Sequence, residues 1–70
     1  MRTLQDKVGC RIRVLRMAAG IPQSTLALMT GITKSYMSEI ESGKKNLTLK
    51  SLERLSQALG VSVSEIFRGL

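Results

Sequence analysis

The sequence predicts an all-α fold, a compact domain of five short helices, from three observations. Apolar residues recur at steps of three or four positions, whereas no segment alternates apolar and polar residues convincingly, as a strand would. Glycine follows four of these periodic segments, where a left-handed residue ends a helix, at positions 20, 31, 43 and 60. Tyr36 and Phe67 are the two aromatic residues, so aliphatic side chains and methionine must fill the core. We interpret residues 1–70 as a single domain.

The first helix is expected to begin after Thr3, which forms a capping-box pattern with Asp6, and to end at Gly20. Residues three or four positions apart give it one apolar face, made of Leu4, Val8, Ile12, Leu15 and Ala19. The opposite face carries Lys7, Arg11 and Arg13. We expect these cations to form an ordinary solvated surface more readily than a set of phosphate contacts.

Two short helices follow, from about Gln23 to Met29 and from about Lys34 to Glu41, joined by a turn at Gly31. Ala27 is small enough for the two helices to cross closely, and the pair would be locked by Ile32, Met37 and Ile40. In a helix-turn-helix spanning about residues 23–42, the second helix would enter a DNA major groove. Spacing alone favours this interpretation no more than a plain helical hairpin with a polar outer face.

Thr48 is expected to open a fourth helix, with an apolar seam of Leu52, Leu55 and Leu59 closed by Gly60. A fifth helix begins with Ser62 and Glu65, again a capping-box pattern. This last segment carries more apolar side chains than a small core needs. We therefore predict a two-fold dimer interface made of Val63, Ile66, Phe67 and Leu70.

The charge balance predicts a polyanionic partner, and the residue types present disfavour catalysis. Eleven lysines and arginines stand against five acidic residues, a net charge of +6, but charge alone does not choose among DNA, RNA and lipid. Cys10 is the single cysteine and histidine is absent, so we expect no disulfide within the chain, no metal site and no cofactor. An enzyme is therefore the weakest interpretation. The short apolar runs and the N-terminus without a signal-peptide pattern predict a cytoplasmic, nucleoid-associated protein with no membrane partner.

The chain resembles the Xre family, which includes the DNA-binding domains of phage Cro and repressor proteins. The resemblance covers residues 9–67 and is carried by Gln23, Leu26-Ala27, Gly31-Ile32, Ser38, Ile40-Glu41, Gly43 and the run Ala58-Leu59-Gly60-Val61-Ser62. Residues 34–38 and 45–53 are most similar to the controller proteins of restriction–modification systems. Two positions depart from the family pattern: Pro22 replaces a serine or threonine cap, and Leu47 replaces a common proline. The resemblance implies a lambda-repressor-like DNA-binding domain.

The resemblance also implies a role for particular residues. Bases would be read from the third helix by Lys34, Ser35, Tyr36, Ser38 and Glu39. Phosphates would be held by Gln23, Lys44, Lys45 and Asn46. Arg16 and Glu41 match positions that form an ion pair in the family. The plain alternatives are a helix-start residue at 23, a structural tyrosine at 36, a solvated basic turn at 44–46 and two unrelated surface charges at 16 and 41.

The expected partners are double-stranded DNA, a second copy of the chain and, as a further candidate, RNA polymerase. The expected function is sequence-specific transcription regulation by a homodimer on a pseudopalindromic operator. Two alternatives stay open. One is an antitoxin that regulates its own synthesis, and the other is a protein-interaction module that uses its exposed apolar residues and whose basic charge is incidental.

Overall fold

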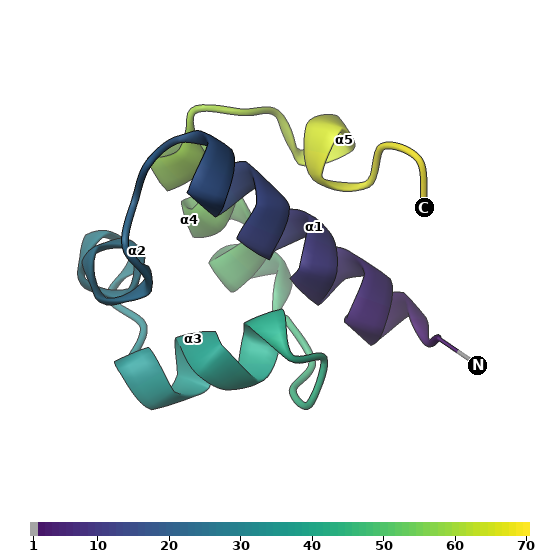
Figure 1. Ribbon diagram of the computed structural model, residues 1–70, viewed down its shortest axis with the longest axis horizontal. Helices are drawn as coiled ribbons and strands as arrows, with labels where there is room; N and C mark the ends of the chain where they lie inside the picture. Colours follow the sequence, from purple (N-terminus) through teal and green to yellow (C-terminus); the bar gives the residue numbers. More distant parts are fainter. Residues whose placement is uncertain (1) are drawn as a thin grey trace.

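The computed structural model describes residues 2–70, and in this part of the chain five helices surround one apolar core (Figure 1). The helices are α1 Leu4–Ala18, α2 Gln23–Thr30, α3 Lys34–Glu41, α4 Leu49–Leu59 and α5 Val63–Ile66. The α3 helix lies along one side of the molecule and α5 along the opposite side. This architecture confirms the predicted all-α, five-helix fold.

Most helices begin at a hydroxyl side chain that accepts a hydrogen bond from the backbone N–H three residues later. Thr3, Thr33, Thr48 and Ser62 act in this way for α1, α3, α4 and α5. Thr3 and Asp6 complete the predicted capping box, because the Asp6 carboxylate in turn accepts from the Thr3 N–H at 3.1 Å. At α2 the cap position is Pro22, which supplies no side-chain hydrogen bond. The first N–H groups of α2 are therefore left without a side-chain acceptor.

The turn between α2 and α3 depends on a glycine. Gly31 ends α2 with φ 70°, in the left-handed region that side chains rarely adopt. The chain then turns back at once, and the Ile32 N–H donates to the Ala27 carbonyl at 3.0 Å. The α2 and α3 helices therefore pack directly against each other as a helix-turn-helix.

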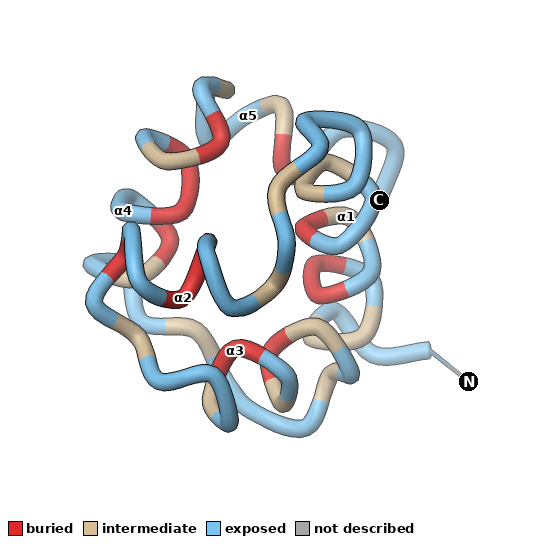
Figure 2. The backbone as a smooth tube through the Cα atoms, turned by 60° about the vertical axis from the view of Figure 1, so that its left-hand side comes forward, coloured by how far each residue is buried: buried red, intermediate tan, exposed pale blue. Residues whose placement is uncertain are grey.

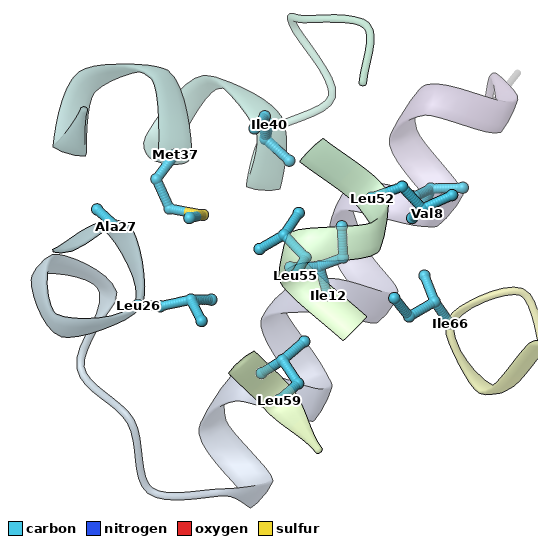
Figure 3. Packing of buried hydrophobic residues seen from close by; sticks show 10 residues of the cluster. All are labelled: Val8, Ile12, Leu26, Ala27, Met37, Ile40, Leu52, Leu55, Leu59 and Ile66. Carbon is cyan, nitrogen blue, oxygen red and sulfur yellow. The ribbon is translucent and has the colours of Figure 1, made fainter. Parts of the chain in front are cut away.

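The core lies at the centre of the five helices, where buried side chains from all of them meet (Figure 3). Met37 and Ile40 are the buried side chains of α3. Figure 2 shows how each helix turns its buried positions toward this centre and leaves the rest partly or fully exposed. The core residues are Val8, Ile12, Leu26, Ala27, Met37, Ile40, Leu52, Leu55, Leu59 and Ile66.

The structure corrects the predicted placements of three residues. Ile66, expected in an exposed dimer interface, is fully buried, because α5 packs against α1 and α4 and turns this side chain inward. Leu4, expected in the core, is 62% exposed at the start of α1. Ala19, at the other end of the predicted apolar face, is also exposed. The ends of the long first helix extend beyond the core that its middle covers.

The α1 and α3 helices approach each other closely at Gly9. A Cβ atom on this buried residue would overlap the carbonyl oxygen of Ile40 and press on the backbone of Glu41. The absence of a side chain at position 9 thus allows the C-terminal end of α3 to rest on α1. This contact sets how α3 is presented on the surface.

Candidate DNA-binding interface

The outward face of α3 is polar and forms the candidate interface. Burial of Met37 and Ile40 turns Lys34, Ser35 and Ser38 to the exposed side, with Glu39 half-buried beside them. A shallow depression between α3 and the start of α2 is lined by predicted interface residues, namely Gln23, Lys34, Ser35, Ser38 and Glu39. It combines an ammonium, hydroxyl groups, an amide and a carboxylate, which can donate to and accept from base edges.

Tyr36 lies apart from that depression and holds the loop that follows α3. Its hydroxyl donates to the Asn46 carbonyl at 2.9 Å. The Lys44 N–H donates to the Glu39 carbonyl at 2.9 Å, so the loop leaves α3 tightly. Lys44, Lys45 and Asn46 are exposed. Three of the four residues predicted to hold phosphates therefore lie together beside the C-terminal end of α3.

Arg16 and Glu41 are in contact and are largely withdrawn from solvent. The Arg16 Nε donates to Glu41 Oε2 at 2.7 Å and its Nη2 donates to Glu41 Oε1 at 3.0 Å. Their side chains are 13% and 4% exposed. The hydrogen bonds to Glu41 raise the pKa of the Arg16 guanidinium above its already high ordinary value. The pair joins α1 to the end of α3 with the planar, two-point geometry that arginine and carboxylate favour.

Gln23 joins this ion pair through a contact that could not be predicted from the sequence. Its Nε2 donates to Glu41 Oε1 at 3.2 Å. Arg16 also reaches the same region, because its Nη1 donates to the Ile21 carbonyl at 2.9 Å, just before α2 begins. The start of α2 and the end of α3 are therefore tied to one arginine of α1. No local pattern signals a contact between residues 18 positions apart, since it depends on how the helices pack.

An apolar groove beside the loop is a second surface feature. Among the predicted interface residues, Val63, Phe67 and Leu70 are partly exposed, and Phe67 lines this groove. Leu4 and Leu49, with 62% and 86% of their surface exposed, border it as well. Sequence reasoning assigned neither leucine to an interface, because Leu4 was expected in the core and Leu49, three positions before Leu52, carries no periodic signal of exposure. The apolar residues of the groove are Leu4, Val8, Ile40, Leu47, Leu49, Leu52 and Phe67.

Residues 2–70 hold no group of three or more histidine, cysteine, aspartate or glutamate side chains placed to bind a metal ion. Within the same residues, no helix combines the length and the apolar character needed to cross a membrane. Cys10 is exposed on α1, a free thiol.

Two helices that pack across a glycine turn, with a polar face on the second, have the architecture of a helix-turn-helix. Residues 12–66 match the family model described as Helix-turn-helix. The chain belongs to this family, the Xre, Cro and repressor-like DNA-binding proteins.

Relatives of known description include restriction–modification controllers. The chain is 32% identical to Control protein C.MunI of Mycoplasma sp, over 96% of this chain and 92% of that one. It is also 32% identical to Control protein C.BamHI of Bacillus amyloliquefaciens, over 83% and 73% of the two chains. The crystal structure of the controller protein C.AhdI from Aeromonas hydrophila superposes with a TM-score of 0.87 at 38% identity, covering 90% and 96%.

These findings define a DNA-binding transcriptional regulator, closely similar to restriction–modification controller proteins, in a family that is not enzymatic.

Proposed function

We propose that this regulator binds a pseudopalindromic operator as a homodimer and reads its bases with the outward face of α3. The observation that carries the proposal is the polar depression lined by Gln23, Lys34, Ser35, Ser38 and Glu39. Because α3 is anchored by buried Met37 and Ile40 and by the Arg16–Glu41 pair, its polar face is held in one orientation. A preset orientation lowers the entropy lost on binding.

The proposed base contacts follow from hydrogen-bonding capacity. Lys34 donates to guanine, Ser35 and Ser38 donate or accept, and Glu39 accepts from the amino group of cytosine. Glu39 makes no side-chain hydrogen bond or ion pair among residues 2–70, so its carboxylate is available to accept from cytosine and to disfavour guanine and thymine, which present acceptors in the major groove. Tyr36 contributes through the edge of its ring rather than as a donor, since its O–H already donates to the Asn46 carbonyl.

Phosphate contacts are proposed on either side of these residues. Lys44, Lys45 and Asn46 present two ammonium groups and an amide beside the end of α3. Gln23 stands at the start of α2, where N–H groups without a side-chain cap favour an anion. Contacts of this kind position a protein on DNA and carry no base sequence.

The proposed dimer forms through the apolar groove that Leu4, Leu49 and Phe67 line, with Val63 and Leu70 of the predicted interface close to Phe67 in the sequence. Burial of exposed apolar side chains would stabilise a two-fold contact of one copy with another. The groove also includes Lys45, Asn46 and Leu47, so it adjoins the DNA-facing loop. A two-fold axis that runs through this contact and points toward the DNA would place both copies of α3 on the same side of the dimer.

DNA as the ligand would place the regulator at work on the nucleoid inside the cell. RNA polymerase is the further protein partner that we propose, because a regulator bound beside a promoter meets the enzyme there. This proposal rests on the class of protein and assigns no residue of the chain to the contact.

The test begins with selection of bound oligonucleotides from a random pool, which yields the half-site sequence and spacing. Lys34→Ala is then expected to weaken binding by about 1–3 kcal/mol and to relax preference at one base position. Lys45→Ala is expected to weaken binding to all sequences and to lower the salt slope by roughly one.

Lys7→Ala is the matched control, since it removes the same charge from α1, next to the C-terminal residues. It should leave base preference unchanged and affect affinity less than Lys45→Ala. A Lys34→Ala protein with wild-type affinity and wild-type base preference would rule out the assignment of α3 residues.

A further inference from the structure

Behind the interface, one carboxylate links a phosphate-contact residue to a buried cation. We propose that Glu41 is a positioning residue for DNA binding. Its carboxylate holds the Gln23 amide so that one N–H points toward the DNA phosphate, and Arg16 neutralises the negative charge of that carboxylate. The inference rests on the proposed function, since it takes Gln23 as a phosphate contact.

The geometry places Gln23 on the partly exposed side of the ion pair. Glu41 Oε1 accepts from Arg16 Nη2 at 3.0 Å and from Gln23 Nε2 at 3.2 Å, so one oxygen serves both donors. Arg16 occupies the other oxygen at 2.7 Å. The Glu41 side chain is 4% exposed and is therefore covered by these partners. Gln23 remains half-buried and also lines the depression at α3.

A carboxylate selects one orientation of the glutamine amide. It can only accept hydrogen bonds, so the Gln23 nitrogen rather than the oxygen must face Glu41. That nitrogen carries two hydrogens, and one of them is used in this contact. The second stays available to a phosphate oxygen, which is also only an acceptor. Without Glu41 the amide could turn its own oxygen toward the phosphate and be repelled.

The charge of Glu41 would oppose DNA binding if it stood alone, because a carboxylate repels a nearby phosphate. The two hydrogen bonds from Arg16 compensate this charge. The Arg16 guanidinium also holds the Ile21 carbonyl at 2.9 Å, which fixes the chain just before Gln23. Holding the amide before DNA arrives reduces the side-chain entropy that would be lost on binding.

The experiment uses the replacement of the whole pair, Arg16→Met with Glu41→Leu, because a buried ion pair can be exchanged for apolar residues without leaving a stranded charge. This double variant lacks the acceptor for Gln23. It is combined with Gln23→Ala, and the affinity of each protein for the selected operator is measured in the range of conditions where urea unfolding shows all of them folded.

We expect Gln23→Ala and the pair replacement each to weaken operator binding by roughly tenfold, the equivalent of one lost hydrogen bond to a charged group. We expect the protein that combines all three substitutions to bind the operator no more weakly than either variant alone. If the two losses in operator affinity multiply in the combined variant, the proposal is overturned. A purely structural role of the pair would weaken binding by the same factor whether or not the Gln23 amide is present. Unchanged affinity of the pair replacement would also overturn it. Unchanged affinity of Gln23→Ala would instead overturn the phosphate contact assigned to Gln23 in the proposed function.

Discussion

The side chains of the Arg16–Glu41 pair are less exposed to solvent than those of the other ion pairs among residues 2–70. Their side chains are 13% and 4% exposed, whereas those of Arg68 and Glu65 are 76% and 32% exposed at a distance of 3.3 Å. An exposed pair contributes little to stability, since solvent and salt screen it. When one partner of a buried pair is removed, the other charge stays buried and unpaired, and this accounts for most of the destabilisation that is measured.

We predict strong coupling between Arg16 and Glu41 in a double-mutant cycle. Arg16→Met or Glu41→Leu alone should lower the free energy of unfolding by roughly 3–5 kcal/mol, because each leaves a buried charge unpaired. The double substitution should lower it much less than the sum. Urea unfolding measures all four proteins.

Arg68→Ala is the control for this cycle, and we expect a change within about 0.5 kcal/mol. Single losses at Arg16 and Glu41 that are equally small and simply additive would mean that the two charges act independently.

The helices were predictable because their signals are local. Each hydroxyl cap, at Thr3, Thr33, Thr48 and Ser62, accepts from an N–H only three residues later. Gly31 likewise suits the left-handed turn because of its own conformational freedom. Neither signal depends on distant parts of the chain. The polar residues of α3 were likewise found from periodicity and from the resemblance to a family.

What the sequence could not supply depends on how the helices pack. Ile66 reads as a surface residue until α5 is laid against α1 and α4, where it becomes part of the core. The contact of Gln23 with Glu41 and the bond from Tyr36 to Asn46 join residues without a periodic relation. The apolar groove likewise arises only when the start of α1, the loop before α4 and Phe67 come together.

We predict that Gly9 determines the seating of α3 on α1. Gly9→Ala should destabilise the protein by about 1–3 kcal/mol or more, because the added methyl overlaps the Ile40 carbonyl and backbone cannot move aside cheaply. Operator binding should weaken as well, since displacement of α3 moves its polar face. Thermal unfolding and operator affinity are the two measurements.

Gly20→Ala provides the comparison, because Gly20 has φ 71° and open space around it. Its cost should be about 1–2 kcal/mol of backbone strain, with operator affinity unchanged for the folded protein. Equal effects of the two substitutions on operator affinity would mean that the close approach at Gly9 does not set the position of α3.

The dimensions of the chain bear directly on how it can read an operator. The molecule measures 31 × 23 × 21 Å and carries a single helix-turn-helix. Successive major grooves on one face of DNA are about 34 Å apart, so one copy reads one half-site and a palindrome requires two. The apolar groove lies at the end of the molecule that holds both the start of α1 and the loop after α3, while α2 lies at the opposite end (Figure 1). Two copies joined through the groove would thus extend the reading surface rather than block it.

Leu49 and Leu28 offer a matched test of this arrangement, because they are 86% and 84% exposed and differ mainly in location. Leu49 borders the groove, whereas Leu28 lies on α2. Neither contributes much to the core of one copy, so serine at either position should leave the unfolding of the monomer nearly unchanged. In the proposed dimer Leu49→Ser removes an apolar contact of about 1.5–3 kcal/mol from each of two symmetric copies. The dissociation constant of the dimer should therefore rise at least tenfold.

Sedimentation equilibrium measures that dissociation, and titration of a full operator against an isolated half-site measures its consequence. Leu49→Ser should bind the half-site as the wild type does and lose affinity for the full operator, because the two half-sites are then occupied independently. Leu28→Ser should match the wild type in both assays. If Leu49→Ser keeps the wild-type dissociation constant, or if Leu28→Ser is the variant that becomes monomeric, the dimer does not form through the groove and its two-fold axis must lie elsewhere on the surface.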